Sequence, residues 1–341
     1  MGADIGDILT REEITFEKLK SKTVAVDGYN ILYQFLSIIR GPDGRPLMDH
    51  KGRVTSHLSG LFYRTCSLIS NDIWLAFVFD GEPPRFKRRE VEVRQERKRE
   101  AEKQYSIALK RGDVEGVRKY SQATARISDY ILESSKQLLG LMGIPCVQAP
   151  SEGEAEAAYL ARQGVVYAAA SQDYDSALFG APRVVRNLGV TGKRKLPGRR
   201  TYVEVRPEVV DVERTFRDLN ITRRQLVDIA LLTGTDYCEG VKGLGPKKAL
   251  ALITGGARVE EIYKERGVEV PENLQEIGEF FMNPPVTEAK TLEFQNPDRE
   301  GVISLLTGEY AFSEERVSRA LDSALSKLQT KRSGLSRFIS G

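Results

Sequence analysis

The chain has 341 residues, of which 40% are hydrophobic and 29% are charged, and its formal net charge is +3. This length and composition can build a buried core, in one large domain or in two ordinary ones. No apolar run approaches the roughly 18 residues of a membrane span, and no signal peptide is visible, so we expect a cytoplasmic protein. With three widely spaced cysteines and two histidines, disulfide frameworks, zinc clusters and histidine catalysis are not expected. Any catalysis must depend on carboxylates, lysines, arginines or hydroxyl groups.

Four short apolar runs predict β-strands, at residues 23–27, 73–80, 144–148 and 165–171. Segments with helical patterns separate these runs. Strands that alternate with helices predict an α/β fold, with a mainly parallel central sheet covered by helices on both faces. After residue 204 the pattern becomes mostly helical, and the polar tail from about residue 331 is expected to be flexible.

Two stretches of the chain are rich in basic residues. The connection between residues 80 and 144 is far longer than an ordinary crossover and predicts an inserted helical region, in which residues 85–126 carry 14 Lys and Arg against 7 Asp and Glu. The alternation of sign there also fits a solvated helix with ion pairs. Residues 183–200 carry seven basic residues and no acidic one. This second stretch predicts two strands whose connecting loop projects cations towards an anionic partner.

Six carboxylates lie at the carboxyl ends of the predicted strands or shortly after them: Asp27, Asp80, Glu152, Glu154, Asp173 and Asp175. Because the carboxyl ends of parallel strands share one edge of a sheet, we expect these side chains to meet there. Each of them alone is explained as well by a turn or a helix cap, and Ser151 with Glu154 fits a capping box. Together, so many like charges at one edge require a cation at neutral pH.

The absence of histidine and cysteine from this set favours a hard, oxygen-binding ion, which is Mg²⁺ with Mn²⁺ as a substitute. The set contains more acids than one Mg²⁺ uses. Two ions about 3.5–4 Å apart would use them, and such a pair clamps the attacking and leaving oxygens in phosphodiester hydrolysis. Basic residues for a polyanion beside acids for divalent metals are the composition expected of a nuclease.

Six stretches of the chain resemble the flap endonuclease family of structure-specific 5′ nucleases: VAVDGYNILYQFL, TSHLSGLFYRT, VFDGEPPRFK, LMGIPCVQAPSEGEAEAAYL, YAAASQDYDSALFG and LLTGTDYCEGVKGLGPKKA. They occur in order along nearly the whole chain, and the short tail resembles the archaeal form. The resemblance implies a PIN-like 5′ nuclease fold with a single nuclease domain at residues 1–330. It also implies a helical arch or gateway at about 83–126, a helix-two-turn-helix element at about 222–256, and a tail at 331–341.

The resemblance assigns roles to residues of the catalytic site. The six acids together with Asp236 would hold the two metal ions. Lys87 and Arg94, seven apart on one predicted helix, would hold the scissile phosphate and stabilise its developing charge. Tyr33 would stack on a base near the cut. From the residues alone, Asp236 fits a turn, Arg94 a solvated helix face and Tyr33 a core aromatic.

Further residues are implied to contact DNA. The segment GVKGLGPKKAL matches the helix-two-turn-helix element, where glycines let the backbone approach a phosphate beside a helix N-terminus; a plain helix hairpin is the alternative. The residues carried over in this element are Gly243, Gly245, Lys247 and Lys248. The family also binds a monovalent cation there, at the stretch occupied by Gly240, Val241 and Leu244. Gly2 is a further DNA contact, and Arg40 and Thr55 match residues near a pocket for a one-nucleotide 3′ flap.

The segment RSGLSRFI (332–339) resembles the motif that docks on a sliding clamp, with Leu335, Phe338 and Ile339 as the docking residues. Arg332 stands where glutamine is usual, and Ile339 stands where a second aromatic is usual. A polar flexible tail is therefore the alternative interpretation.

Together with this resemblance, the sequence predicts a monomeric, metal-dependent 5′ flap endonuclease with 5′–3′ exonuclease chemistry. The resemblance implies that it acts on branched DNA in replication and repair. Its activity is expected in the cytoplasm, on the nucleoid. Duplex binding should be electrostatic and should weaken steeply with salt. Two alternatives stay open: a related 5′ nuclease for bubbles, nicks or four-way junctions, and a protein that binds junction DNA without cutting it.

Overall fold

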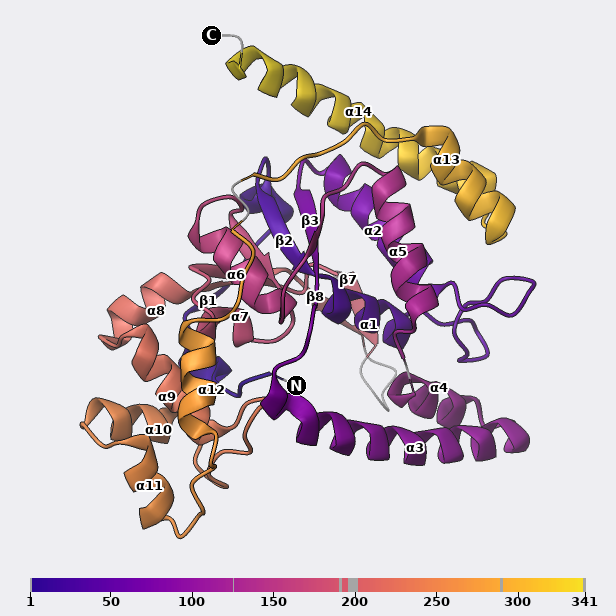
Figure 1. Cartoon of the computed structure of the whole chain (residues 1–341). Coiled ribbons are helices and arrows are strands. Elements are labelled where there is room, and N and C mark those ends of the chain that lie inside the picture. The colour runs from indigo at the N-terminus through magenta and orange to yellow at the C-terminus, as the bar shows by residue number, and fades with distance from the viewer. Residues whose placement is uncertain (1, 125, 190–191, 196–201, 289–290, 340–341) are drawn as a thin grey trace.

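The structure is a computed structural model that describes residues 2–124, 126–189, 192–195, 202–288 and 291–339. For residues 88–95, 97–98, 123, 192–195, 202–204 and 328–339 it describes the backbone only. In the described chain, one central sheet lies between two layers of helices (Figure 1).

The central sheet has the strand order β1-β9-β6-β5-β2-β3-β4. Its strands are β1 (Arg11–Glu13), β2 (Thr23–Asp27), β3 (Trp74–Phe79), β4 (Cys146–Gln148), β5 (Ala168–Ala170), β6 (Arg183–Arg186) and β9 (Glu208–Asp211). Neighbouring strands from β6 to β4 are parallel, which confirms the predicted α/β fold with a mainly parallel sheet. Strands β9 and β1 add an antiparallel edge that the sequence pattern did not indicate.

Strand β2 shows why the parallel strands could be predicted from runs of hydrophobic residues. Successive side chains of a strand point to opposite faces, and here Val24 and Val26 belong to one core while Ala25 belongs to the other. All three are buried. A strand that is covered on both faces must be apolar at every position, so it appears as a continuous hydrophobic run.

One face of the sheet is covered by α1 (Gly28–Ile38), α2 (Ser56–Ser70) and α5 (Asp129–Leu141). Behind them lie α13 (Arg299–Ile303), the π-helical segment η4 (Ser304–Glu309) and α14 (Glu314–Ile339). The core on this side includes Leu32, Phe62, Phe77 and Leu138, all nearly inaccessible to solvent.

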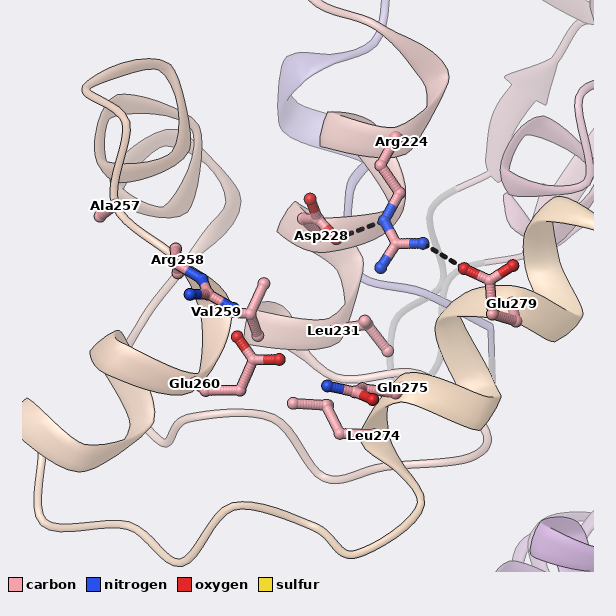
Figure 2. Close-up of a pocket in the computed structure, with 10 residues that line it drawn as sticks. All are labelled: Arg224, Asp228, Leu231, Ala257, Arg258, Val259, Glu260, Leu274, Gln275 and Glu279. Carbon is pink, nitrogen blue, oxygen red and sulfur yellow. Dashed lines mark hydrogen bonds and ion pairs between the residues drawn. The ribbon is translucent and has the colours of Figure 1, made fainter.

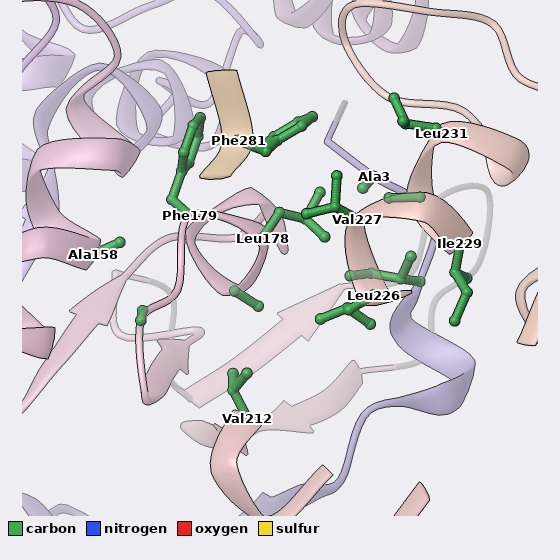
Figure 3. Close-up of a cluster of buried hydrophobic side chains, with 14 of the residues drawn as sticks. Ala3, Ala158, Leu178, Phe179, Val212, Leu226, Val227, Ile229, Leu231 and Phe281 are labelled. Carbon is green, nitrogen blue, oxygen red and sulfur yellow. The ribbon is translucent and has the colours of Figure 1, made fainter. Parts of the chain in front are cut away.

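The other face is covered by α6 (Gly153–Arg162), α7 (Asp175–Leu178), α8 (Val212–Leu219) and α9 (Arg223–Thr233). Leu178 and Phe179 of the α7 segment meet Leu226, Val227 and Phe281 in the core that Figure 3 shows. From α9 the chain continues into α10 (Pro246–Thr254), α11 (Val259–Glu265) and α12 (Leu274–Met282). The α7–α9 contact therefore ties this helical region to the sheet.

The long connection after β3 contains a short 3₁₀ turn, η3 (Arg85–Lys87), followed by α3 (Arg88–Arg111), α4 (Val114–Ala123) and α5. Helices α3 and α4 pack on each other, and α4 contacts α1; in Figure 1 they lie at the opposite end of the molecule from α14. Gly112 ends α3 with a positive φ of 66°, which a glycine adopts without strain. Asp113 then caps α4 through the backbone N–H of Gly116.

The basic stretch around residues 183–205 is built differently from the prediction. We expected two strands in it, but β6 belongs to the central sheet, and a separate two-stranded sheet is formed by β7 (Gly192–Lys195) and β8 (Tyr202–Val205). The loop expected to carry the cations, 196–201, lies outside the described residues.

The C-terminal region is helical where a flexible tail was expected. Helix α14 continues through residues 331–339, and residues 340–341 lie outside the described part of the chain. No described helix is both long enough and apolar enough to cross a membrane.

Candidate functional site

Two of the predicted acids lie side by side at the carboxyl ends of parallel strands. Asp27 is the last residue of β2 and caps α1, because its Oδ1 accepts a hydrogen bond from the backbone N–H of Asn30 at 3.0 Å. Asp80 follows β3, which pairs with β2. Its Oδ1 accepts a hydrogen bond from the backbone N–H of Gly153 at 2.7 Å. A Cβ on Gly153 would lie 2.7 Å from that oxygen, so only glycine permits this approach.

Glu152 and Glu154 begin α6, on either side of Gly153. Glu152 occupies the N-cap position and Glu154 lies in the first turn. Both oxygens of Glu152 accept hydrogen bonds from Lys87 Nζ, at 2.9 and 2.7 Å. Glu154 Oε1 accepts a hydrogen bond from the Ser176 hydroxyl at 3.3 Å.

The capping box considered for this helix start is not formed. The hydroxyl of Ser151 donates to the carbonyl of Glu82 at 2.9 Å instead of capping α6, and the N-cap residue Glu152 makes no side-chain cap. This alternative explanation for Glu154 is therefore wrong.

Asp173 and Asp175 follow β5, in a bend that leads into α7. Asp173 accepts hydrogen bonds from the backbone N–H of Gly2 at 3.2 Å and from the side-chain amide of Asn30 at 2.9 Å. Asp175 accepts one from the backbone N–H of Ala3 at 2.7 Å. Although the chain is not extended between them, both carboxylates are bound by the amino-terminal segment.

Burial and mutual repulsion raise the pKa values of several acids in this cluster. Burial raises the pKa of Asp27 well above its ordinary value, and the charge of Asp80 raises it further. Burial also raises the pKa of Glu154, for which Asp175 is the strongest charged neighbour. For Asp175, burial and then the charge of Asp236 raise the pKa to about 7, against the hydrogen bond from Ala3. The acids therefore share one electrostatic environment.

Asp236, which reasoning from strand ends missed, belongs to the same cluster. It lies in the loop after α9, and its charge contributes, after burial, to the raised pKa of Glu152 as well as that of Asp175. The next residue, Tyr237, packs edge-on against Phe86 with ring centroids 5.0 Å apart. The residues adjacent to Asp236 and Lys87 are thus in contact. In the sequence, only the resemblance of LLTGTDYC could have indicated this acid.

Within the described residues, no three acidic, histidine or cysteine side chains lie close enough together to form a ready-made metal site. The hydrogen bonds give the reason, because the carboxylates are turned towards backbone amides, Asn30 and Lys87. The donor set nevertheless fits a hard divalent cation, since it consists of carboxylate oxygens. The raised pKa values indicate a deficit of positive charge, which such a cation would supply.

The predicted basic pair lies at the start of α3. Lys87 is the last residue of η3 and the N-cap of α3, with helical backbone angles, and Arg94 follows within that helix. A shared face for the two side chains stays a prediction. Burial alone would lower the pKa of Lys87, but the ion pair with Glu152 raises it above the ordinary value. The side chain of Arg94 lies outside the described residues.

Tyr33 is 47% exposed on α1, so the interpretation as a core aromatic is wrong. Arg40 contacts α4: its guanidinium donates to the carbonyl of Ser121, on α4, at 3.0 Å, and to that of Ser37 at 3.3 Å. Thr55 is buried directly before α2. A contact of Arg40 and Thr55 with a 3′ flap stays a prediction.

The predicted helix-two-turn-helix segment consists of α9, a loop at 234–245 and α10. Gly243 has a φ of 81° in this loop, a left-handed conformation that favours glycine. Gly245 precedes α10 as its N-cap, and Lys247 and Lys248 are exposed in the first turn. These lysines lie where a helix N-terminus would attract a phosphate.

The roles of the monovalent-cation stretch and of the clamp-binding residues stay predictions. The backbone of the proposed monovalent-cation site turns sharply at Gly240, where φ is 67°, and Val241 and Leu244 are buried beside it. The proposed clamp residues Leu335, Phe338 and Ile339 lie on α14, and their side chains are outside the described residues.

A cavity of about 350 Å³ lies between α9, α11 and α12 (Figure 2). The guanidinium group of Arg224 lies in it and donates hydrogen bonds to Asp228 Oδ1 at 3.1 Å and to Glu279 Oε1 at 2.7 Å. None of the seven predicted acids lines this cavity. It is therefore separate from the acidic cluster.

The chain is similar to known nucleases along nearly its whole length. Residues 6–101 match the XPG N-terminal domain family and residues 143–236 match the XPG I-region family. Flap endonuclease 1 of Pyrococcus furiosus is 52% identical over 324 residues, which is 94% of each chain. Flap endonuclease 1 of Archaeoglobus fulgidus is 51% identical over 339 residues, which is 99% of this chain and 100% of the relative.

Solved structures give the same result. The flap endonuclease-1 from Methanococcus jannaschii superimposes with a TM-score of 0.77 and 42% identity, over 97% of this chain and all of the other. The catalytic core of Rad2, solved in complex with a DNA substrate, gives a TM-score of 0.71 at 22% identity and covers 95% of this chain. The second likeness extends the shared fold beyond the close relatives.

Proposed function

Since this chain belongs to the flap endonuclease family, we propose that its acidic cluster is the centre at which it hydrolyses phosphodiester bonds of branched DNA. The observation that supports this assignment is the electrostatic coupling of the predicted acids. Burial and like-charged neighbours raise the pKa of acids from separate segments of the chain. Metal-dependent phosphodiester hydrolysis uses such a set of carboxylates, because they hold divalent cations beside the phosphate.

The proposed cofactor is a pair of Mg²⁺ ions, for which Mn²⁺ can substitute. Its proposed ligands are Asp27, Asp80, Glu152, Glu154, Asp173, Asp175 and Asp236. When bound, such ions supply an activated water and neutralise charge on the attacking and leaving oxygens. Lys87 lies at the cluster and can turn from Glu152 to the scissile phosphate, where an ammonium group stabilises developing negative charge. Arg94 would assist Lys87, and exposed Tyr33 offers a ring on which a base can stack.

The proposed substrate is a 5′ flap in DNA that is being replicated or repaired. The arch at 83–126 would admit the single strand. The helix-two-turn-helix segment would bind the duplex backbone through Gly243, Gly245 and the two exposed lysines, with a monovalent cation in its loop. Gly2, which already binds Asp173, would lie beside the DNA.

The remaining partners follow from this substrate. Residues 335–339 would dock on a sliding clamp, and the enzyme would act as a monomer. Its place would be the cytoplasm, on the nucleoid, where the DNA is.

Replacing Asp80 by asparagine tests the proposal. Asparagine keeps an oxygen for the Gly153 N–H but removes the charge, so cleavage of a 5′-flap substrate should fall at least about 10²-fold. Affinity for the same DNA, measured by fluorescence anisotropy with Ca²⁺ in place of Mg²⁺, should be nearly unchanged. Asp218→Asn is the control, because Asp218 lies at the surface, where it pairs with Arg214. Cleavage at the wild-type rate by Asp80→Asn would show that the cluster is not the catalytic centre.

A panel of substrates separates the proposed reaction from its alternatives. Flap, nicked, bubble and four-way-junction DNA should be compared under the same conditions, and the flap should be cut fastest. Preference for a bubble or a four-way junction would indicate the related 5′ nuclease instead. Binding without cleavage of any substrate would indicate a junction-binding protein.

A further inference from the structure

The loop that carries Asp173 and Asp175 is held by an arginine of the neighbouring strand. Arg186 ends β6, which pairs with β5 in parallel. Its Nε donates to the carbonyl of Gln172 at 3.1 Å, and one terminal nitrogen donates to the Tyr174 hydroxyl at 2.5 Å. One guanidinium group thus binds the loop on both sides of Asp173.

The guanidinium group of Arg186 is itself fixed in place. Its carbon lies 4.3 Å from the centroid of the Tyr174 ring, which is a cation–π contact. The nitrogen that bonds Tyr174 also bonds Glu208 of β9 at 2.9 Å. The side chains of Arg186 and Glu208 are only 20% and 17% exposed. A planar group with several directed N–H donors is needed to make these contacts at once.

Tyr174, which Arg186 holds in place, in turn contacts the amino-terminal segment. It packs closely on the 3₁₀ turn η1 (Gly6–Ile8), because a Cβ on Gly6 would lie only 2.7 Å from the Tyr174 hydroxyl. The same segment supplies the backbone N–H groups of Gly2 and Ala3 that bind Asp173 and Asp175. Contacts of Arg186 therefore restrain both the loop that bears the two acids and the segment that orients them.

We propose that Arg186 is a positioning residue that fixes the backbone bearing Asp173 and Asp175 at the cluster, so that the two carboxylates need only exchange hydrogen bonds to bind divalent cations. This inference rests on the proposed metal-dependent nuclease function. Its physical basis is that ligands whose supporting contacts are lost must be reordered when the ion binds, which weakens binding. A conservative change to lysine keeps the positive charge but cannot bond Gln172, Tyr174 and Glu208 together.

Arg183 provides a matched control on the same strand. It also lies over a tyrosine ring, that of Tyr167 at 5.0 Å, and pairs with Glu213 at 3.9 Å. It begins β6, whereas Arg186 ends it at the edge where the acids lie. A lysine at either position changes the same chemical group by the same amount.

The experiment measures Mn²⁺ binding to the DNA-free protein by isothermal titration calorimetry, which requires no catalysis. Arg186→Lys should weaken Mn²⁺ binding by about 10-fold or more, and Arg183→Lys should bind Mn²⁺ as the wild type does. In cleavage assays, Arg186→Lys should need more Mn²⁺ for half-maximal rate, with an unchanged KM for DNA. Wild-type Mn²⁺ affinity in Arg186→Lys would overturn the inference, as would equal losses in the two variants.

If Arg186→Lys does not fold, Tyr174→Phe replaces it. This variant removes only the hydroxyl that Arg186 and Arg11 bond, and it should still weaken Mn²⁺ binding measurably. Unchanged affinity there would overturn the inference. Failure of the proposed function would give a different result. The wild-type protein would then not bind Mn²⁺ at the cluster, and Asp173→Asn would not weaken any Mn²⁺ binding that is observed.

Discussion

The contact between Lys87 and Glu152 places a positive charge inside the acidic cluster. Their side chains are only 18% and 11% exposed, and Nζ lies 2.7 Å from the nearer oxygen. In this position the lysine compensates part of the repulsion among the acids. A partly buried ion pair of this kind contributes little net stability, but removal of one partner leaves the other charge uncompensated.

Lys87→Met should therefore lower the free energy of unfolding of the metal-free protein by about 3 kcal/mol. Urea denaturation without divalent ions measures this change. The double variant Lys87→Met with Glu152→Gln should recover part of the loss, because no unpaired charge remains. Arg85→Met, two residues away and exposed, is the control. Equal stability of the Lys87 and Arg85 variants would mean that the ion pair does not compensate the cluster.

The raised pKa values of the acids predict how the stability of the metal-free protein depends on pH. Burial and the charge of Asp236 raise the pKa of Asp175 to about 7, whereas an unfolded aspartate titrates near 4. Between these two pH values, Asp175 is protonated in the native state but ionised in the unfolded state. The free energy of unfolding therefore falls as the pH rises from about 4 to about 7. His57 acts in the opposite direction, since burial lowers its pKa to about 4.

Asp175→Asn should make this decline shallower, because asparagine does not titrate. Thermal unfolding in a chelator across this pH range provides the measurement, and Asp218→Asn serves as the unburied control. Addition of a divalent cation should also flatten the profile of the wild-type protein. A profile that is unchanged in Asp175→Asn would contradict the assignment of a raised pKa to this residue.

Among the larger elements, helix α4 is held to the segment around residues 40–46 by hydrogen bonds. Arg40 donates to the carbonyl of Ser121, and the hydroxyl of Ser121 donates to the carbonyl of Gly44 at 3.2 Å. Gly44 has a φ of 79°, and a Cβ there would lie 3.2 Å from the carbonyl of Val114. The loop at 41–46 and α4 are thus fitted to each other by hydrogen bonds and close packing.

Arg40→Ala should release α4 locally without unfolding the sheet. Amide hydrogen exchange should become faster in residues 114–123 and 41–46, while α2 stays protected. Arg45→Ala is the matched control, because Arg45 is exposed and pairs only loosely with Asp43 at 3.6 Å. Unchanged exchange in 114–123 would show that Arg40 does not hold α4.

The strands that could be predicted are those whose burial requires a run of hydrophobic residues in the sequence. Strands β3 and β5 are buried throughout, and β2 is buried from Val24 onwards, so each is an apolar run that ends at or near its acid. Strand β1 has the sequence REE, with all three residues exposed, and its pairing with β9 depends on backbone hydrogen bonds rather than on hydrophobic side chains. No pattern of side chains marks such an edge strand.

Across the whole molecule, the acids could be predicted but their orientation could not. Asp173 and Asp175 are bound by Gly2 and Ala3, which are more than 170 residues away in the chain. Arg186 was only one member of a basic stretch until the fold placed it beside their loop. Contacts of this kind arise from tertiary packing, and local sequence carries no signal of them.

Because the acids come from segments that lie far apart in the sequence, the metal-free protein does not present them as a finished metal site. The carboxylates come from the ends of β2 and β3, the start of α6, the segment that leads into α7 and the loop after α9. No three of those that the structure describes form a ready-made metal site. Binding of a cation must exchange some hydrogen bonds of the cluster for metal–oxygen bonds. The central claim is that this exchange occurs and that the seven acids supply the ligands.

A crystal structure of the protein soaked with Mn²⁺, with anomalous difference maps, tests that claim most directly. We predict two Mn²⁺ peaks about 3.5–4 Å apart, surrounded by carboxylates of the cluster, with Lys87 moved away from Glu152. Peaks located elsewhere, or acids that keep their present contacts and leave no ligand oxygens for a cation, would contradict it.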